Sequence, residues 1–179
     1  MITIRPIRAD EIRSAKLVIL KVAYGIFGWE GTLEESIQYF ESTGALGDMD
    51  DFQAEYLDRD GLFLAVLDDE TLIGSGAIRK IGEETAELKR MWLLETYHQR
   101  GLGFQVIQQL FGFARQKGYL TVRLQTSPQQ ARALDFYRRV GFREIPSYNR
   151  DTSEISMEIT LSGTNPKEDS SSLQSKEVP

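Results

Sequence analysis

A strand, a helix and a second strand follow one another in the middle of the chain, with two glycines at the first junction. Residues 86–94 and 120–125 have the short, apolar pattern of strands, and residues 104–117 place their apolar side chains on one face of a helix. Such a unit normally closes as a right-handed crossover between two parallel strands. We therefore expect a sheet with at least one parallel pair and a helix packed on it.

The remaining segments extend this unit into one mixed sheet. Further strands are expected at residues 2–8, 62–67, 72–80, 142–146 and 155–161. Helices are expected at residues 10–23 (capped by Asp10), from Leu33 to Gly44 (capped by Thr32 and Glu35), in the acidic segment 48–60 and from Ser127 to Gly141 (capped by Ser127). The order β-α-α-β-β-β-α-β-α-β-β predicts an α+β fold with three layers, a mixed α/β sheet between helices. Residues 1–161 are assigned to one domain, and the polar residues 162–179 to a disordered tail.

Composition excludes several kinds of site. The 179 residues include no cysteine and one histidine, His98, so thiol chemistry is excluded and we expect no metal. The net charge of −6 argues against nucleic acid as a partner. No segment approaches the roughly 20 apolar residues of a membrane span, and the N-terminal residues MITIRPIR lack the apolar region of a signal peptide. A cytoplasmic protein without a membrane partner is the expectation.

The glycine turn is the motif that carries chemistry. Gly101 and Gly103 lie between the end of a strand and the start of a helix. Glycine lets a ligand approach the backbone closely, and a helix start offers unpaired N–H groups and a positive dipole end. The turn is therefore either a phosphate or pyrophosphate cradle, assisted by Arg100, or an ordinary strand-to-helix turn. The third glycine of a dinucleotide-binding motif and the Gly-Lys-Ser/Thr of a P-loop are both missing.

Two segments together resemble a known family. The first is His98-Gln99-Arg100-Gly101-Leu102-Gly103, and the second is Ala133-Leu134-Asp135-Phe136-Tyr137-Arg138-Arg139-Val140-Gly141-Phe142. In this order, around a helix and a strand, they resemble the GNAT superfamily of acyl-CoA-dependent N-acetyltransferases. Residues 87–91 and 142–146 resemble a bacterial subgroup of that family whose acceptor is unassigned. His98 and Gln130 depart from the residues usual in the family at these positions.

The resemblance implies a site for acetyl-CoA. The backbone from Gln99 to Phe104 would hold the pyrophosphate, and the strand residues Met91 to Leu93 would pair with the pantetheine arm at a place where residues 86–94 and 120–125 diverge. The residues expected to contact the cofactor are Met91, Trp92, Leu93, His98, Gln99, Arg100, Gly101, Leu102, Gly103, Phe104, Gln130 and Asp135. The implied activity is acetyl transfer to a primary amine.

Two residues are expected to carry the chemistry. The resemblance makes Tyr137 the general acid near the CoA sulfur, whereas periodicity alone also fits a core tyrosine. Glu87 is the candidate base, at the offset of the glutamate base in the histone acetyltransferase branch, and otherwise a solvated carboxylate or a partner of Lys89 or Arg90. A backbone N–H near Met91 or Trp92 is expected to stabilise the oxyanion. Without cysteine, an acetyl-cysteine intermediate is excluded and direct attack in a ternary complex is expected.

The acceptor site is less sharply defined. The residues expected to line it are Phe27, Trp29, Glu30 and Tyr148, with Tyr24 and the acidic residues 48–55 nearby. Aromatic and acidic side chains suit a cationic amine, although most of these acids would equally be solvated surface.

Other classes of protein remain open at this stage. One is a module of the same fold that binds or senses acyl-CoA without catalysis, and another is a nucleotide-phosphate-binding protein. The oligomeric state is also open, with a homodimer as one option.

Overall fold

A computed structural model describes residues 1–149 and 152–161 of the chain. The expected tail, residues 162–179, lies outside the described residues. In the described part, no helix is both long enough and apolar enough to cross a membrane.

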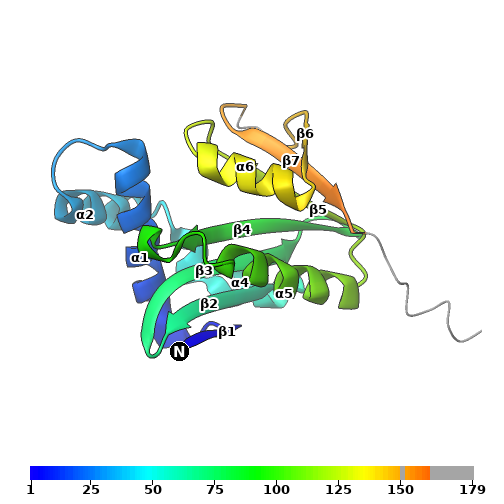
Figure 1. Cartoon of the computed structure of the whole chain (residues 1–179), viewed down its shortest axis with the longest axis horizontal. Helices are drawn as coiled ribbons and strands as arrows, with labels where there is room; N and C mark the ends of the chain where they lie inside the picture. The colour runs from blue at the N-terminus through cyan, green and yellow to red at the C-terminus, as the bar shows by residue number, and fades with distance from the viewer. Residues whose placement is uncertain (150–151, 162–179) are drawn as a thin grey trace, which may run out of the picture.

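A mixed seven-stranded sheet in the order β1-β2-β3-β4-β5-β7-β6 forms the middle of the described residues, so the expected α+β fold is confirmed (Figure 1). Its strands are β1 (Ile2–Pro6), β2 (Leu62–Asp68), β3 (Thr71–Lys80), β4 (Thr85–Leu93), β5 (Thr121–Thr126), β6 (Arg143–Ile145) and β7 (Ile155–Thr160). Only β4 and β5 pair in parallel, and every other neighbouring pair among these strands is antiparallel. The predicted crossover helix, α5 (Leu102–Gln116), connects the two strands of this parallel pair.

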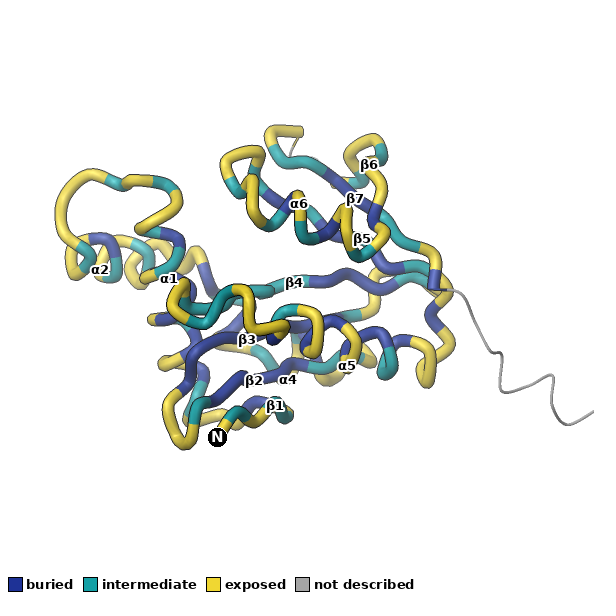
Figure 2. Tube along the Cα trace, in the orientation of Figure 1, coloured by how far each residue is buried: buried dark blue, intermediate teal, exposed yellow. Residues whose placement is uncertain are grey.

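Helices cover both faces of the sheet. One face packs on α5 and α6 (Ala131–Val140), and the other on α1 (Ile12–Phe27) and on the segment that holds α3 (Gly47–Asp50) and α4 (Phe52–Glu55). Successive side chains of β2 point to opposite faces and so belong to different cores. Leu64 and Val66 lie in the core on the α5 side, whereas Phe63 and Ala65 lie in the core on the α1 side. β2 and β3 are accordingly the most continuously buried strands of the sheet (Figure 2).

Some of the predicted helix boundaries are confirmed and others are wrong. In α2 (Leu33–Thr43) the expected capping box is confirmed, since Glu35 N–H donates to the Thr32 hydroxyl (3.2 Å) and Thr32 N–H to the Glu35 carboxylate (2.7 Å). The cap at Asp10 is wrong, because a 3₁₀ turn (Ala9–Glu11) precedes α1. The predicted end of this helix near residue 23 is also wrong, because it continues to Phe27.

The predicted start of α6 is wrong as well. The Ser127 hydroxyl accepts from Gln129 N–H (3.2 Å) and closes a local turn, so the helix begins only at Ala131. The predicted short helix in residues 48–60 is instead α3, α4 and a 3₁₀ turn (Leu57–Arg59).

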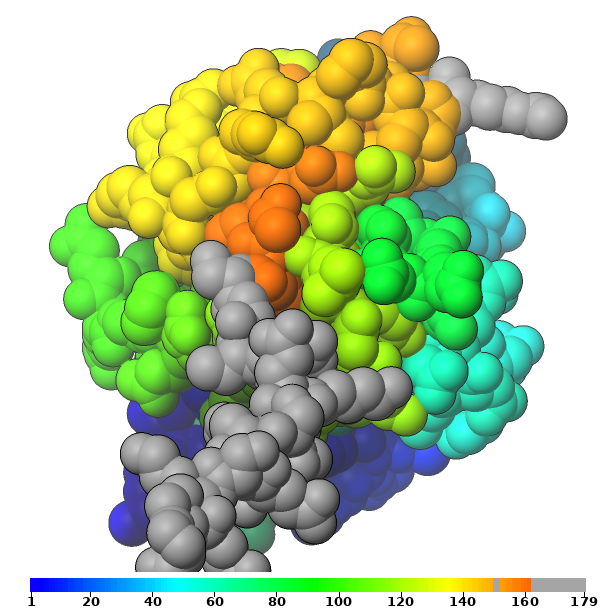
Figure 3. Space-filling view, turned by 90° about the vertical axis from the view of Figure 1, so that its right-hand side faces the viewer, coloured from blue at the N-terminus to red at the C-terminus, as the bar shows by residue number. Residues whose placement is uncertain are grey.

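Backbone bonds close the end of the sheet where β4 and β5 begin. Leu120 N–H donates to Glu84 O (2.9 Å), and Leu161 N–H donates to Leu120 O (2.8 Å). Figure 3 views this end, where the end of β7, the start of β5 and the turn before β4 lie against one another. Any divergence of β4 from β5 must therefore open at their opposite ends.

Gly76 sets how closely α5 approaches the sheet. A Cβ at this position would lie 2.5 Å from Val106 Cγ1 and 2.6 Å from Met91 Sδ. We therefore expect Gly76→Ala to lower the free energy of unfolding by about 1–3 kcal/mol, measured by urea denaturation. The control is Gly112→Ala within α5, where no atom lies within 4 Å of the added Cβ; it should stabilise the helix by about 0.5–1 kcal/mol. Equal effects of the two substitutions would contradict this account of the packing.

Candidate functional site

Strands β4 and β5 separate in the middle of the sheet. They pair only between residues Thr85–Glu87 and Thr121–Arg123, while β5 continues against β7 as far as Thr126. Beyond Glu87, β4 has no ladder partner on this side among the described residues, and the two ribbons diverge (Figure 1). The divergence implied by the family resemblance is therefore present.

A β-bulge lies in the unpaired part of β4. Ser75 pairs with Trp92 and Ala77 with Lys89, so Arg90 and Met91 together oppose Gly76. Arg90 has a φ of +55°, and its carbonyl accepts a bond from the Ser75 hydroxyl (2.8 Å). Bulges increase the local twist of a strand, which helps β4 to turn away from β5.

The bulge also decides which side chains share a face. Ala86 and Leu88 belong to the core under α5, so Glu87 and Lys89 point to the opposite face, where α3 and α4 lie. Arg90 stays on that face because of the bulge and bonds to Asp48 of α3. Met91 and Leu93 return to the α5 side, whereas Trp92 packs on the α1 side. A polar face and an apolar face therefore meet at the gap.

The glycine turn presents backbone donors beside the gap. Gln99 and Gly101 have φ of +62° and +75°, and α5 begins at Leu102 without a side-chain cap. The first bond into this turn runs from Gln105 N–H to Gly101 O (3.1 Å), so Leu102, Gly103 and Phe104 precede it. Free N–H groups at the positive end of a 15-residue helix fit the pyrophosphate of CoA.

Side chains around the turn are also suited to a phosphorylated ligand. Arg100 is exposed, and its guanidinium lies 4.8 Å from the centre of the Tyr97 ring. Phe104 is exposed over 54% of its surface although it is apolar, and a Cβ at Gly103 would meet only Phe136, at 3.6 Å. Packing within the chain therefore does not explain why a glycine stands at position 103.

Three of the expected cofactor contacts are engaged within the protein. His98 Nε2 donates to Leu93 O (2.9 Å), and its Nδ1 accepts from Arg132 of α6. Gln130 Oε1 accepts from the Thr126 hydroxyl (2.9 Å) and from Ser127 N–H (3.2 Å). Asp135 is exposed and pairs with Arg138 (3.4 Å), beside a cavity of about 560 Å³ lined by Arg132, Asp135, Arg138 and Arg139. His98 thus connects β4 to α6, a role that the sequence did not suggest.

Tyr137 is a core residue with one polar atom. It is 7% exposed, and its ring contacts those of Phe136 and Phe142. Burial raises the pKa of its hydroxyl, so the group remains protonated. The hydroxyl has no hydrogen-bond partner among the described residues, yet no side-chain oxygen there is both fully buried and unpartnered. The small exposed part of Tyr137 therefore includes its hydroxyl.

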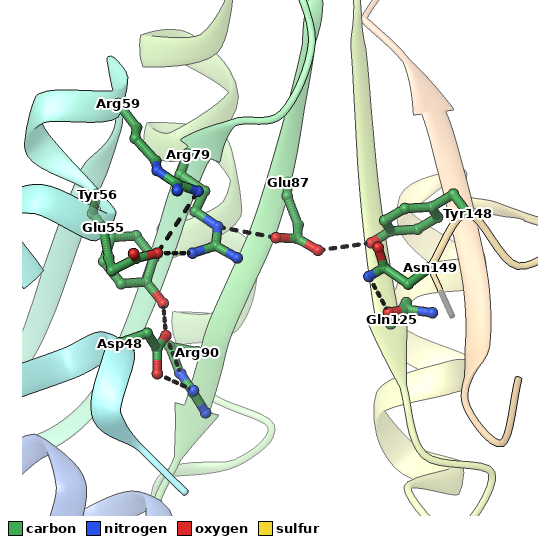
Figure 4. Close-up of polar contacts among 10 residues, drawn as sticks. All are labelled: Asp48, Glu55, Tyr56, Arg59, Arg79, Glu87, Arg90, Gln125, Tyr148 and Asn149. Atoms are coloured by element: carbon green, nitrogen blue, oxygen red, sulfur yellow. Dashed lines mark hydrogen bonds and ion pairs between the residues drawn. The ribbon is translucent and has the colours of Figure 1, made fainter. Parts of the chain in front are cut away.

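Glu87 lies where β4 and β5 separate and is only 5% exposed, so the alternative of a solvated carboxylate is wrong. It does not pair with Lys89 or Arg90; Arg79 Nε donates to one carboxylate oxygen (3.1 Å), and the Tyr148 hydroxyl donates to the other (3.0 Å). Figure 4 shows Tyr148 reaching across the gap from the side of β5. Burial and the Glu87 charge raise the pKa of Tyr148, so it remains a donor.

The acidic segment is tied to arginines. Asp48 accepts bonds from Arg90 and from the Tyr56 hydroxyl, and Glu55 accepts from Arg79 (2.7 Å) and lies 3.7 Å from Arg59 (Figure 4). For Asp48 and Glu55 the expectation of solvated surface is therefore wrong. Their charges are compensated inside the protein, which removes the main argument for a cationic acceptor.

The expected aromatic acceptor residues form a cluster at the C-terminal end of α1. Phe27 stacks on Trp29 (5.7 Å between ring centres), and Trp29 packs on Phe40 of α2 (4.3 Å). Glu30 is exposed. Only Tyr148 of the four expected residues contacts Glu87.

Sequence reasoning missed Arg79. It stands directly opposite Glu87 in the antiparallel register of β3 and β4, and such cross-strand neighbours interact. This register is set by the turn between β3 and β4, where Ile81 N–H and Gly82 N–H both donate to Thr85 O.

No group of three or more potential ligand side chains (His, Cys, Asp or Glu) that could hold a metal ion occurs in the described ranges 1–149 and 152–161.

Comparisons with known proteins agree with this geometry. The family model described as the acetyltransferase (GNAT) family matches residues 29–142. Probable N-acetyltransferase camello of Xenopus tropicalis is 28% identical over 120 residues, which are 65% of this chain and 54% of that relative. This chain therefore spans about half the length of that curated relative.

Solved structures share the fold. An acetyltransferase of the GNAT family from Staphylococcus aureus Mu50 aligns with a TM-score of 0.75 and 17% identity, covering 90% of this chain and 99% of that one. The PaiA N-acetyltransferase of Thermoplasma acidophilum, solved in complex with coenzyme A, aligns with a TM-score of 0.72 and 24% identity, covering 89% and 99%.

The Asp48–Arg90 pair should make stability depend on pH. Burial disfavours the charged carboxylate, but Arg90 outweighs it and holds the pKa of Asp48 below its ordinary value of 3.8. The stabilisation is therefore present above pH 3.8 and is lost as the pH falls through the lower pKa of the folded state. We expect Asp48→Ala to cost about 3 kcal/mol near neutral pH, because it leaves Arg90 unpaired.

Urea denaturation of the parent protein and of Asp48→Ala should show this loss at neutral pH and a shrinking difference in acid. The exposed neighbour Asp51, changed to alanine, is the control and should cost little at either pH. A difference that stays constant down to the lowest pH would contradict the assignment.

Proposed function

This chain belongs to the acetyltransferase (GNAT) family, and we propose that it transfers an acetyl group from acetyl-CoA to a primary amine. One observation carries the proposal: the glycine turn at the start of α5 lies beside a gap in the sheet, at the base of which Glu87 is buried. A phosphate cradle, an unpaired strand edge and a buried carboxylate are the parts that acetyl transfer from a thioester requires.

The residues of the turn and of β4 would hold acetyl-CoA. The backbone from Gln99 to Phe104, with Arg100, suits the pyrophosphate. The edge of β4 from Met91 to Leu93 suits the amides of the pantetheine arm, which would add to the sheet like a strand. Bound acetyl-CoA supplies the thioester whose carbonyl is attacked.

In this proposal the two substrates enter the gap from opposite faces of the sheet. Tyr137 belongs to the core on the α5 side, together with the cradle, whereas Glu87 lies on the side of α3 and α4. Entry of the cofactor from the first side and of the acceptor from the second brings an amine and a thioester together in the gap. This arrangement supports direct attack in a ternary complex.

Proton removal is the first chemical requirement. An amine with a lysine-like pKa of about 10.4 costs about 4.6 kcal/mol to deprotonate at pH 7. Glu87 accepts this proton directly or through one water, and its bonds from Arg79 and Tyr148 hold the carboxylate in one orientation. The amine nitrogen then forms the C–N bond as the C–S bond breaks, and the second proton that the nitrogen loses replaces the one that Tyr137 gives to the sulfur.

Proton delivery to the sulfur is the second requirement. The Tyr137 hydroxyl is protonated and has no hydrogen-bond partner among the described residues. It belongs to the small part of this residue that is exposed. A thiolate leaving group would give it a partner, and Tyr137 would supply the proton that makes CoA a neutral thiol.

A module that binds acyl-CoA without catalysis is the second candidate. The cradle and the unpaired edge of β4 would serve that function equally well. The buried Glu87 speaks against it, because a binding module has no need of a carboxylate at the base of the gap. The binding module would be favoured if the variants Tyr137→Phe and Glu87→Gln, described below, left every measured property unchanged.

Tyr137→Phe should lower kcat by about 10²–10⁴-fold if the hydroxyl protonates the leaving thiolate. Thiol release from acetyl-CoA with a panel of amines measures this. CoA should still raise the melting temperature of the variant as much as that of the parent, which separates chemistry from binding. Tyr39→Phe, at a 62% exposed position on α2, is the matched control. Binding of CoA without turnover on any amine, even by the parent protein, would contradict the catalytic proposal.

Glu87→Gln should produce a loss that depends on pH. At neutral pH we expect kcat/KM to fall by about 10²–10⁴-fold, because the protonated amine has lost its base. The deficit should shrink toward pH 10, where solvent already supplies much of the free amine. The control is Glu84→Gln, in the exposed turn before β4. An equal deficit at every pH would assign Glu87 to positioning instead of proton transfer.

A further inference from the structure

Lys89 stands on the acceptor side of the gap, two residues after Glu87. Residues i and i+2 of a strand share a face, and the neighbours of Glu87 on either side, Ala86 and Leu88, belong to the opposite core. The bulge keeps Arg90 on the face of Lys89 as well. The Lys89 side chain therefore belongs to the same polar group as Glu87, Arg79 and Asp48, whose charges act on it.

The other charged groups of this surface already have partners. Arg79 bonds to Glu55 and to Glu87, and Arg90 bonds to Asp48. Each of the three carboxylates there accepts a bond from an arginine, and two of them accept a second bond from a tyrosine. Asp48, Glu55 and Glu87 are therefore all engaged in bonds within the described part of the chain.

Lys89 is the exception. Its ammonium forms no ion pair or hydrogen bond with any of the described residues, although the side chain is only partly exposed. Burial lowers the pKa of Lys89, although the nearby negative charge of Glu87 opposes this shift. An anion placed next to this ammonium would restore the lost compensation.

We propose that the acceptor amine carries a carboxylate, as a free amino acid does, and that Lys89 binds this carboxylate while Glu87 receives the proton of the amine. This inference rests on the proposed acetyl transfer. Glu87 and Lys89 are about 6.6–6.8 Å apart along the strand, because each strand residue advances about 3.3 Å. An amine and a carboxylate separated by one carbon fit between two side chains at that spacing. A diamine would instead place a second cation beside Lys89, at an electrostatic cost.

The test compares two acceptors in two proteins. Glycine and glycinamide differ in the carboxylate, and the ratio of their kcat/KM values in thiol release from acetyl-CoA is measured for the parent and for Lys89→Met. Because amine reactivity is the same in both proteins, it cancels when the two ratios are compared. We expect the preference for glycine to fall by at least about tenfold in the variant, as for the loss of one charge-assisted hydrogen bond.

Four further arms, two variants and two acceptors, make the outcome decisive. Lys89→Arg should keep most of the preference, and Lys80→Met, at an exposed position at the end of β3, should keep all of it. Glycylglycine tests whether a more distant carboxylate is accepted, and 1,4-diaminobutane tests a cationic acceptor.

A ratio unchanged by Lys89→Met, or a parent protein that prefers 1,4-diaminobutane to glycine, would overturn the inference and leave acetyl transfer intact. Absence of turnover with every acceptor would instead reject the proposed function itself.

Discussion

β4 and β5 pair in parallel over only three residues each, and the geometry of the site follows from that limit. Backbone N–H and C=O groups that leave a ladder need other partners. On β5 the antiparallel partner β7 supplies them on one side as far as Thr126, whereas the edge of β4 beyond Glu87 remains available. An extended ligand with its own amides is the natural occupant of such an edge. The helix that follows β4 begins beside the same gap with free N–H groups, which suit the phosphate end of the proposed cofactor.

Without contacts between its two sides, the divergence of β4 from β5 would reduce the stability of the fold. His98 connects Leu93 of β4 to Arg132 of α6, and the Tyr148 hydroxyl reaches Glu87 from the side of β5. These bonds lie at opposite parts of the gap, one beside the glycine turn and one at its base. Each bond uses a side chain from a loop, and the first engages the backbone carbonyl of Leu93 at the end of β4. The lone histidine of the chain thus has a structural role within the cofactor motif.

Much of the architecture could be predicted because it depends on local patterns. The strand, glycine turn and helix from residue 86 to 117, the capping box at Thr32 and the ends of α2 and α6 at Gly44 and Gly141 follow from periodicity and capping. In both wrong boundaries a local turn precedes the helix: the Glu11 carboxylate accepts from Arg8 N–H around a 3₁₀ turn before α1, and the Ser127 hydroxyl closes a turn before α6. The partners of Glu87 could not be predicted, since Arg79 becomes its neighbour through strand register and Tyr148 through a loop 61 residues away.

The bulge at Arg90 and Met91 explains why the acceptor side differs from what composition suggested. Without the extra residue, Arg90 would point toward α5, and Asp48 would be an uncompensated acid facing the gap. With it, two successive residues share one face, Arg90 neutralises Asp48, and Lys89 is left beside Glu87 with no direct ion pair or hydrogen bond to any of the described residues. A count of acids in residues 48–55 therefore predicts a surface for cations, whereas the paired charges favour an acceptor that brings its own anion. The inserted residue thus decides which charged side chains of β4 meet those of α3.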